Sequence, residues 1–245
     1  MKKLLTSLSL SLVLLSASFQ AVQATYPSKN KVSTVQNDER NVKNFNGVAA
    51  GGNINVVITL GSTESLRFEG DADAIATLIT EVKGNVLVIR PEISWSSWSR
   101  KYDNKKITAY ISAKTIKSLT MSGSGNMSVN GQIKENSLAT TLSGSGSITT
   151  SADVANFTGV ISGSGSLNIS GSADDSTITI SGSGSFTRKG FSTGHLTSVI
   201  SGSGNISINA NSSIDAVISG SGSLNYSGNA RVEQRTSGSG RVRKI

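Results

Sequence analysis

Large apolar residues alternate with small polar residues along the C-terminal half of the chain. The tetrapeptide Ser-Gly-Ser-Gly interrupts this alternation seven times, and successive copies are separated by 21, 19, 19, 20, 18 and 18 residues. Their first serines are Ser122, Ser143, Ser162, Ser181, Ser201, Ser219 and Ser237. Six of the seven copies follow a large apolar residue, and all seven have an apolar residue two places after the closing glycine. The period of two predicts strands, and a flexible linker would not keep so regular a spacing.

Such a repeat, whose short strands cannot bury an apolar face alone, is typical of a solenoid. At about 3.3 Å per residue, one repeat is long enough to go once around a narrow coil whose turns lie about 4.8 Å apart. Glycine permits the φ values and the close backbone approach that a corner needs. The pattern therefore predicts an all-β, right-handed parallel β-solenoid, or β-helix, with 18 to 21 residues per SGSG repeat over residues 116–245.

The segment before the repeats alternates glycine-rich turns with short apolar runs. Strands are predicted at residues 54–58, 66–69, 86–90 and 107–111. One short helix is predicted from a cap at Asp73 through Val82, because apolar residues recur on one face and Gly84 follows. The stretch SWSSWSRKYDN, residues 94–104, is predicted as a loop. The N-terminal segment is thus expected to be rich in strands.

The N-terminus has the order of a secretory signal. Lys2 and Lys3 precede an apolar run from Leu8 to Leu15, and small residues follow up to Ala24. The run is shorter than the about 20 apolar residues that usually span a membrane. We therefore predict a signal peptide at 1–24, a flexible segment at 25–40 and a single domain at 41–245. After cleavage no transmembrane segment is expected, and the protein is expected in the periplasm, on the outer-membrane surface or outside the cell.

Charge and cysteine content change this picture little. The chain contains no cysteine, so it folds after export without disulfides. Removing residues 1–24, with two lysines and no acid, lowers the formal charge from +8 to +6. Basic residues cluster at 100–106 and 231–244, where we expect mainly a solvated surface, with attraction for anionic sugars, lipopolysaccharide or nucleic acid as the alternative. Nucleic acid is not expected as a partner, because no aromatic residues alternate with the C-terminal cluster.

Five motifs occur in order along the chain: VKNFNGV at 42–48, the strand at 54–58, EGD at 69–71, EVKGNVLVI at 81–89 and the Ser-Gly-Ser-Gly-Asn repeats. Together they resemble the auto-transporter adhesin head domain called GIN. The resemblance covers about residues 40–245. It implies an exported bacterial β-solenoid that is adhesin-like by name, and it brings no catalytic residue to this chain.

One motif matches the formula of a hydrolase nucleophile. GFSTG at 190–194 has the Gly-x-Ser-x-Gly pattern, and the single histidine, His195, follows at once. A nucleophile elbow needs a strand, a sharp turn and a helix, with the histidine supplied from a distant loop. We interpret this motif as a turn of the repeat, and we assign no catalytic residue.

Acidic residues recur 10 to 14 positions after the first serine of most repeats. They are Glu135, Asp153, Asp174, Asp175, Asp215 and Glu233. In a solenoid such acids would line one edge as a ladder that binds a cation or cleaves a polysaccharide. The alternative is that they are solvated turn residues. No metal ligand and no cofactor is assigned.

The aromatic residues Trp95, Trp98 and Tyr102 are the main recognition candidates. They lie in the predicted loop beside Arg100 and Lys101. Aromatic faces stack on sugar rings, and the neighbouring cations favour acidic glycans or phosphorylated lipid headgroups. The alternative is that the indoles fold back and cover an open end of the core.

Two function classes follow. The first is an exported, non-catalytic, adhesin-like or envelope-associated module that binds a glycan, another envelope component or a protein. The second is a polysaccharide-active β-helical enzyme that uses the carboxylate ladder. Clustering of the acids in a groove would favour the enzyme, whereas a flat face of serine and asparagine would exclude it.

Overall fold

The computed structural model describes residues 35–102 and 105–245. The predicted signal peptide at 1–24 lies outside the described residues, as do Asp103 and Asn104 of the predicted loop. The described part is almost entirely β-structure, and its strands belong to one 16-stranded sheet that coils into a β-solenoid of about seven turns. This confirms the fold class expected from the repeat.

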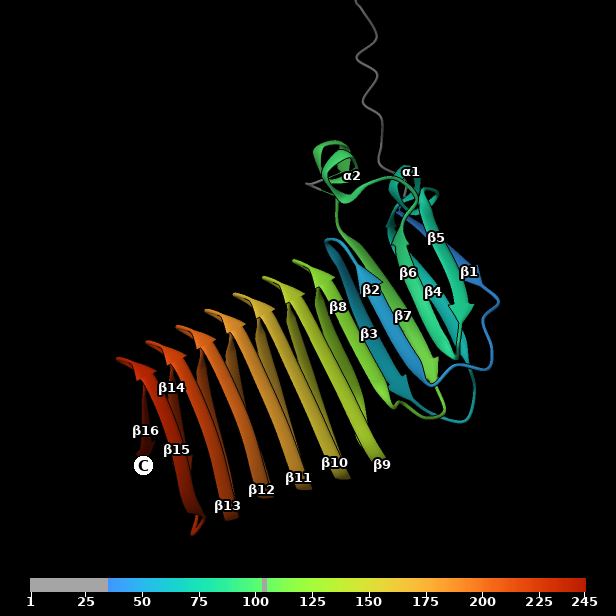
Figure 1. Ribbon diagram of the computed structural model, residues 1–245. Coiled ribbons are helices and arrows are strands. Elements are labelled where there is room, and N and C mark those ends of the chain that lie inside the picture. Colours follow the sequence, from blue (N-terminus) through green and yellow to red (C-terminus); the bar gives the residue numbers. More distant parts are fainter. Residues whose placement is uncertain (1–34, 103–104) are drawn as a thin grey trace, which may run out of the picture. The chain divides into compact units, whose positions relative to one another are not determined.

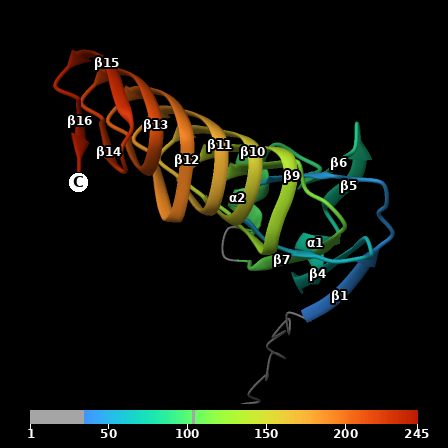
Figure 2. The same cartoon turned by 90° about the horizontal axis from the view of Figure 1, so that it is seen from below.

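The regular turns of the solenoid are single long strands. They are β9 (Asn126–Gly144), β10 (Ser147–Gly163), β11 (Ser166–Gly182), β12 (Ser185–Gly202) and β13 (Asn205–Gly220), followed by β14 (Ser223–Ser227), β15 (Arg231–Gly238) and β16 (Arg241–Lys244). Each pairs in parallel with the turn before it, and all but β15 and β16 also pair with the turn after it. Figure 1 shows the turns side by side, and Figure 2 shows them as successive loops of one coil. Every regular strand ends at the first glycine of an SGSG motif.

The SGSG motif is an ordered corner. Gly163 has φ of 120°, and a Cβ on it would lie 2.5 Å from the carbonyl oxygen of Gly144 in the preceding turn. The amide of Ser164 donates to that same oxygen at 3.0 Å, so the corners of successive turns are hydrogen-bonded to one another. Only glycine adopts this conformation while the backbones approach so closely. The repeat therefore needs glycine here for a steric reason.

The core consists of stacked apolar side chains inside the coil. Ile148, Leu167 and Phe186 occupy one inward row and are all buried. The ring of Phe157 lies 5.5 Å from that of Phe191, within the range of a stabilising aromatic pair. The alternation read from the sequence thus corresponds to inward and outward positions of each strand.

The N-terminal part extends both faces of the coil. Its elements are β1 (Val35–Arg40), β2 (Gly47–Gly51), β3 (Ile54–Leu60), β4 (Ser65–Asp71), α1 (Ala72–Ile75), β5 (Leu78–Lys83), β6 (Val86–Pro91), α2 (Trp95–Tyr102), β7 (Ile107–Ala113) and β8 (Ser118–Gly123). One face has the order β1-β4-β7-β3-β9, and β2 pairs with β6 and β8. The four strands predicted in this region are all present.

One prediction for this region is wrong. The expected helix from Asp73 to Val82 is one turn, α1, capped by Asp71, whose side chain accepts a hydrogen bond from the Ala74 amide. The rest forms β5, which pairs antiparallel with β6, because a β-branched run beside an available strand is more stable extended. Of the segment expected to be flexible, residues 35–40 form β1, which pairs with β4, and residues 25–34 lie outside the described residues.

Candidate functional site

Trp98 and Tyr102 lie in the core rather than in an exposed loop. Residues 95–102 form helix α2, so the predicted loop is wrong at these positions. Trp98 has no exposed surface and Tyr102 is 6% exposed, and their ring centroids are 5.3 Å apart. The indole Nε1 of Trp98 donates to Thr77 Oγ1 at 2.8 Å. A ligand cannot stack on a buried indole, so for Trp98 the structure agrees with the covering alternative.

The cations of α2 remain at the surface. Arg100 and Lys101 are exposed, and the Lys101 ammonium lies 5.1 Å from the centre of the Tyr102 ring. The side chain of Trp95 lies outside the described residues. Ligand binding by Trp95, Arg100 and Lys101 therefore stays a prediction. Of these three residues, the structure describes only the two cations as exposed, so binding there would depend mainly on charge.

The repeat carboxylates do not form a ladder. Asp153 pairs in register with Lys134 and Ser172, whereas Asp175 pairs with Asn156 and His195. Within this set of six acids, only Asp215 and Glu233 are register partners in the described strands. Among the described residues, no three Asp, Glu, His or Cys side chains gather in a possible metal site. The geometry required by the enzyme alternative is not formed along any one row.

The outward row that begins each turn is polar instead. It contains Asn126, Ser147, Ser166, Ser185, Asn205 and Ser223. Ser147 Oγ donates to Asn126 Oδ1 at 2.7 Å, and Ser223 Oγ donates to Asn205 Oδ1 at 2.6 Å. A face of serine and asparagine does not fit the alternative of a polysaccharide-active enzyme.

The Gly-x-Ser-x-Gly motif also lacks the geometry of a nucleophile elbow. It lies within strand β12, where Phe191 is buried and no helix follows. His195 continues the same strand, and its Nδ1 lies 2.9 Å from Ser213 Oγ in the next turn. The motif is thus part of the repeat, although it is extended strand rather than the turn that we predicted.

A groove of about 690 Å³ lies over strands β1, β4, β7 and β3. Its volume is in the range of about 300–1,000 Å³ that is typical of small-molecule sites. Two outward cross-strand rows contribute to its lining. The first contains Val57, Tyr110, Arg67 and Glu39, and the second contains Thr59, Ser112 and Ser65. We call it the Arg67–Tyr110 groove.

Arg67 lies over the ring of Tyr110, its neighbour on the sheet. Its guanidinium carbon is 4.4 Å from the centre of the Tyr110 ring, a cation–π contact. Its Nη1 donates to Asn37 Oδ1 at 3.0 Å and to Glu69 Oε2 at 3.4 Å. Because both residues stand on strands, the groove has a preorganised aromatic and cationic surface.

One wall of the groove is held by a partly buried carboxylate. Glu64 accepts hydrogen bonds from the backbone amides of Asn44 at 3.1 Å and Phe45 at 3.3 Å. These bonds stabilise the charged form, the Asn44 amide most of all, and hold the pKa of Glu64 below its ordinary value, with a further contribution from Lys114. The carboxylate thereby fixes the segment that connects β1 to β2.

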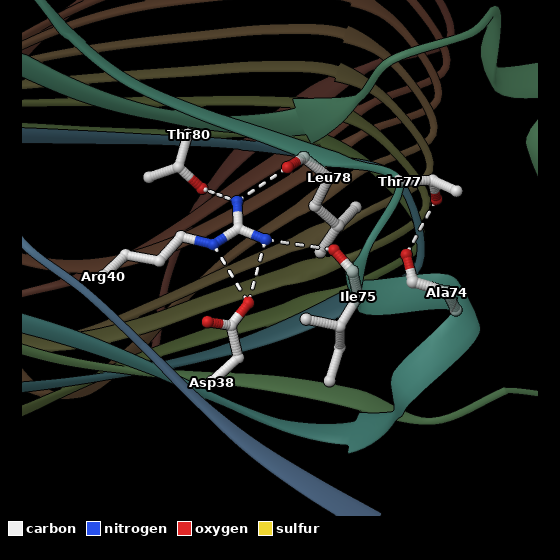
Figure 3. Close-up of polar contacts among 7 residues, drawn as sticks. All are labelled: Asp38, Arg40, Ala74, Ile75, Thr77, Leu78 and Thr80. Atoms are coloured by element: carbon white, nitrogen blue, oxygen red, sulfur yellow. Dashed lines mark hydrogen bonds and ion pairs between the residues drawn. The ribbon is translucent and has the colours of Figure 1, made fainter.

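Arg40 fixes strand β1 beside the groove (Figure 3). Its Nη1 donates to the Leu78 carbonyl at 2.6 Å and to Thr80 Oγ1 at 2.7 Å, and its Nη2 donates to the Ile75 carbonyl at 3.1 Å. The guanidinium also bonds Asp38 and lies 4.8 Å from the centre of the Phe68 ring. This arginine joins β1 to the end of α1 and to β5.

A second depression of about 540 Å³ lies near the C-terminal turns. It runs between an outward row of Thr197, Asp215 and Glu233 and another of Val199, Val217 and Arg235. Val199 and Val217 are 36% and 43% exposed. It has no aromatic residue, and the Arg67–Tyr110 groove is therefore the stronger candidate site.

Sequence reasoning missed this groove although it predicted three of its four strands. In β7 the outward positions are Thr108, Tyr110 and Ser112, so an aromatic residue among small hydroxyl residues was the available signal. The pairing that brings Arg67 onto Tyr110 comes from the antiparallel register of β4 with β7. That register is not visible in either strand alone.

No helix within the described ranges is long and apolar enough to cross a membrane.

Comparisons with solved structures agree with the solenoid fold. A structure named "a putative adhesin" from Bacteroides fragilis is 21% identical with a TM-score of 0.75, and the match covers 86% of this chain and 97% of that chain. A structure named "putative lipid binding protein" from Parabacteroides distasonis is 20% identical with a TM-score of 0.71, covering 87% of this chain and 98% of that chain. At these identities the likeness concerns the fold alone.

The sequence itself was compared with curated proteins and with models of protein families. None of the curated proteins matches it. The family model described as "Putative auto-transporter adhesin, head GIN domain" matches residues 44–230, which include both the N-terminal strands and most of the repeats. The chain belongs to this GIN-domain family.

Proposed function

We propose that this protein is an exported, non-catalytic, adhesin-like module that binds a glycan or another component of a cell envelope in the Arg67–Tyr110 groove. The observation that carries the proposal is the groove itself, in which Arg67 lies over Tyr110 on a rigid sheet. Tyrosine and arginine are enriched among residues that dominate binding energies. Family membership supports the adhesin-like role, but a fold does not by itself name a ligand.

The rigidity of the groove favours binding without prior ordering. Its floor consists of paired strands, and its walls are held by the hydrogen bonds of Glu64 and Arg40. A site that is already ordered loses little conformational entropy when a ligand binds. The proposal includes no polysaccharide cleavage, which is supported by the repeat carboxylates: only Asp215 and Glu233 of the six share a row.

Export is the first part to test. The protein, expressed with its own N-terminus in a bacterial host with an outer membrane, is expected in the periplasm, on the surface or in the medium. Mass spectrometry should find Thr25 as the first residue, because small residues precede a cleavage site after Ala24. A chain that stays in the cytosol and begins at Met1 or Lys2 would contradict export.

Binding is tested with the exported, purified protein on a glycan array and on isolated envelope fractions. The first variant is Arg67→Ala/Tyr110→Ala, which removes the stacked pair. The second is Arg100→Ala/Lys101→Ala, which removes the exposed cations of α2 and so tests the predicted Trp95 to Tyr102 site. Both variants are compared with the wild type by thermal unfolding, to establish that each is folded.

The proposal expects binding by the wild type and by the α2 variant, and loss of binding in the groove variant. Loss in the α2 variant alone would move the site to that helix. Binding that neither variant weakens would place the ligand elsewhere on the solenoid, and absence of binding to every glycan and fraction would count against an adhesin-like role.

A further inference from the structure

We infer that the Arg67–Tyr110 groove takes a neutral, hydroxyl-rich oligosaccharide rather than an anionic sugar or a phosphorylated headgroup. The inference rests on the proposed function, because it names the ligand class of the same site. This ligand class differs from the one expected for α2, whose exposed cations, Arg100 and Lys101, favour acidic glycans.

The charges around the groove compensate one another. The charged residues that line it are Glu39, Arg40, Glu64 and Arg67, and the Arg40 guanidinium lies over Phe68 on the buried face of the sheet, so the groove has no excess of positive charge. Arg67 lies 3.4 Å from Glu69 and pairs in register with Glu39, and Arg40 bonds Asp38 at 3.1 Å. An anionic ligand would therefore compete with acids already placed beside each arginine, and long-range attraction would be weak.

The hydrogen-bonding groups of the groove suit hydroxyl groups. Among the described residues, all hydrogen bonds of Arg67 run through Nη1, so its Nε and Nη2 keep donors for a ligand. Glu39 offers carboxylate acceptors, and the hydroxyls of Thr59 and Ser65 both donate and accept. A sugar hydroxyl also donates and accepts, so neighbouring hydroxyls of one ring can use an arginine donor and a carboxylate acceptor together.

The apolar part of the groove suits the carbon face of a sugar ring. Val57 and Tyr110 are adjacent in one cross-strand row, and the flat Arg67 guanidinium extends this surface toward Glu39. Arginine stacks through its delocalised plane in a way that lysine does not. At about 690 Å³, the groove is the size of sites that bury drug-sized ligands, which corresponds to a short oligosaccharide.

The test compares neutral with acidic oligosaccharides of equal length. The probes are oligomers of glucose, mannose, galactose and N-acetylglucosamine, with oligogalacturonate as the acidic member, titrated calorimetrically into the exported, purified protein. The inference expects a neutral oligomer to bind best, with an affinity that changes little when the ionic strength is raised. Preference for oligogalacturonate, with binding that weakens in salt, would overturn it.

Three variants connect the binding to the groove. Tyr110→Ala should weaken binding of the neutral oligomer by at least about tenfold, because it removes the stacked surface. Tyr110→Phe, which keeps the ring, should retain most of the affinity and shows that the effect does not come from misfolding. Glu39→Gln removes one negative charge from the groove. It should therefore raise the affinity for oligogalacturonate relative to the wild type. Unchanged neutral binding in Tyr110→Ala would contradict the inference.

The two proposals fail in different ways. If the wild type binds envelope fractions through the groove but binds none of the neutral oligomers, the ligand class is wrong and the adhesin-like function stands. If it binds neither the fractions nor any oligomer, both proposals are wrong.

Discussion

The indole Nε1 of Trp98 donates a hydrogen bond of 2.8 Å to the hydroxyl of Thr77, which in turn donates at 2.7 Å to the carbonyl of Ala74. This chain of bonds connects helix α2 to the end of α1. It explains why a tryptophan in a serine-rich stretch is fully buried, since its polar atom has a partner and its rings pack against Tyr102.

Trp98→Ala is expected to lower the free energy of unfolding by about 3–5 kcal/mol, because it leaves a large cavity under α2. Trp98→Phe should cost less, since it keeps apolar contacts and loses chiefly the bond to Thr77. Urea denaturation measures both. Arg100→Ala on the same helix is the control and should change stability by less than about 0.5 kcal/mol. Equal effects of Trp98→Ala and the control would show that the indole is not part of the core.

Gly163→Ala is expected to destabilise the solenoid by on the order of 3 kcal/mol. Its φ of 120° disfavours any side chain, and the new Cβ would lie 2.5 Å from the Gly144 oxygen. Gly61→Ala is the matched control, because its nearest neighbour would be Ser112 Oγ at an ordinary 3.7 Å. The control should be neutral or stabilising by up to about 1 kcal/mol. Similar unfolding midpoints for both variants would contradict the steric role of the SGSG corner.

The lowered pKa of Glu64 predicts that the protein loses stability in acid. Its pKa is lower in the folded protein than in the unfolded chain, mainly because the Asn44 amide bonds the carboxylate. The group therefore stabilises the fold above its unfolded pKa, about 4.3, and this contribution is lost as pH falls through the lower folded value. Denaturation midpoints measured across this range should fall less steeply in Glu64→Gln than in the wild type. Parallel curves for the two proteins would show that Glu64 does not contribute.

Arg40→Lys is expected to lower the free energy of unfolding by about 1.5–3 kcal/mol. Lysine keeps the charge but cannot reach the carbonyls of Ile75 and Leu78 together, which leaves acceptors without a donor. Arg90→Lys is the control, because Arg90 makes a half-exposed ion pair with Glu81 at 3.6 Å and a long bond of 3.5 Å to the Pro91 carbonyl. It should change stability by less than about 0.5 kcal/mol in the same denaturation assay. A larger effect at Arg90 than at Arg40 would contradict the role of the Arg40 bonds.

The repeats could be predicted because their structure is local and repeated. Each turn stacks on an almost identical turn, so Gly144 meets Gly163 and Ile148 meets Leu167 wherever the spacing is regular. The alternation within one repeat then decides which side chains face inward. The strand at 54–58 was found for the same reason, as it continues the stack beside β9.

Outside the repeats, where each segment packs against a different partner, the local pattern of apolar residues was ambiguous. Leu78, Ile79 and Val82 have a spacing that fits a helix, yet their segment is strand β5 because β6 offers an antiparallel partner. The stretch around Trp98 was read as a loop because serines interrupt it, yet burial of the indole against Tyr102 and Thr77 accompanies a helix. In both cases a contact distant in sequence outweighed local propensity.

The sequence alone determined the β-solenoid, its repeat length, the role of glycine at each corner and the family resemblance, because these depend on residues that recur at short, regular intervals. Only the tertiary structure decided that Trp98 is buried, that among the six repeat acids only Asp215 and Glu233 share a row, and that Arg67 lies over Tyr110. The first depends on the packing of helix α2 against Thr77, and the other two depend on the register between paired strands. Register is set by the packing of the whole coil, since a shift of one residue would turn every side chain of a strand to the opposite face.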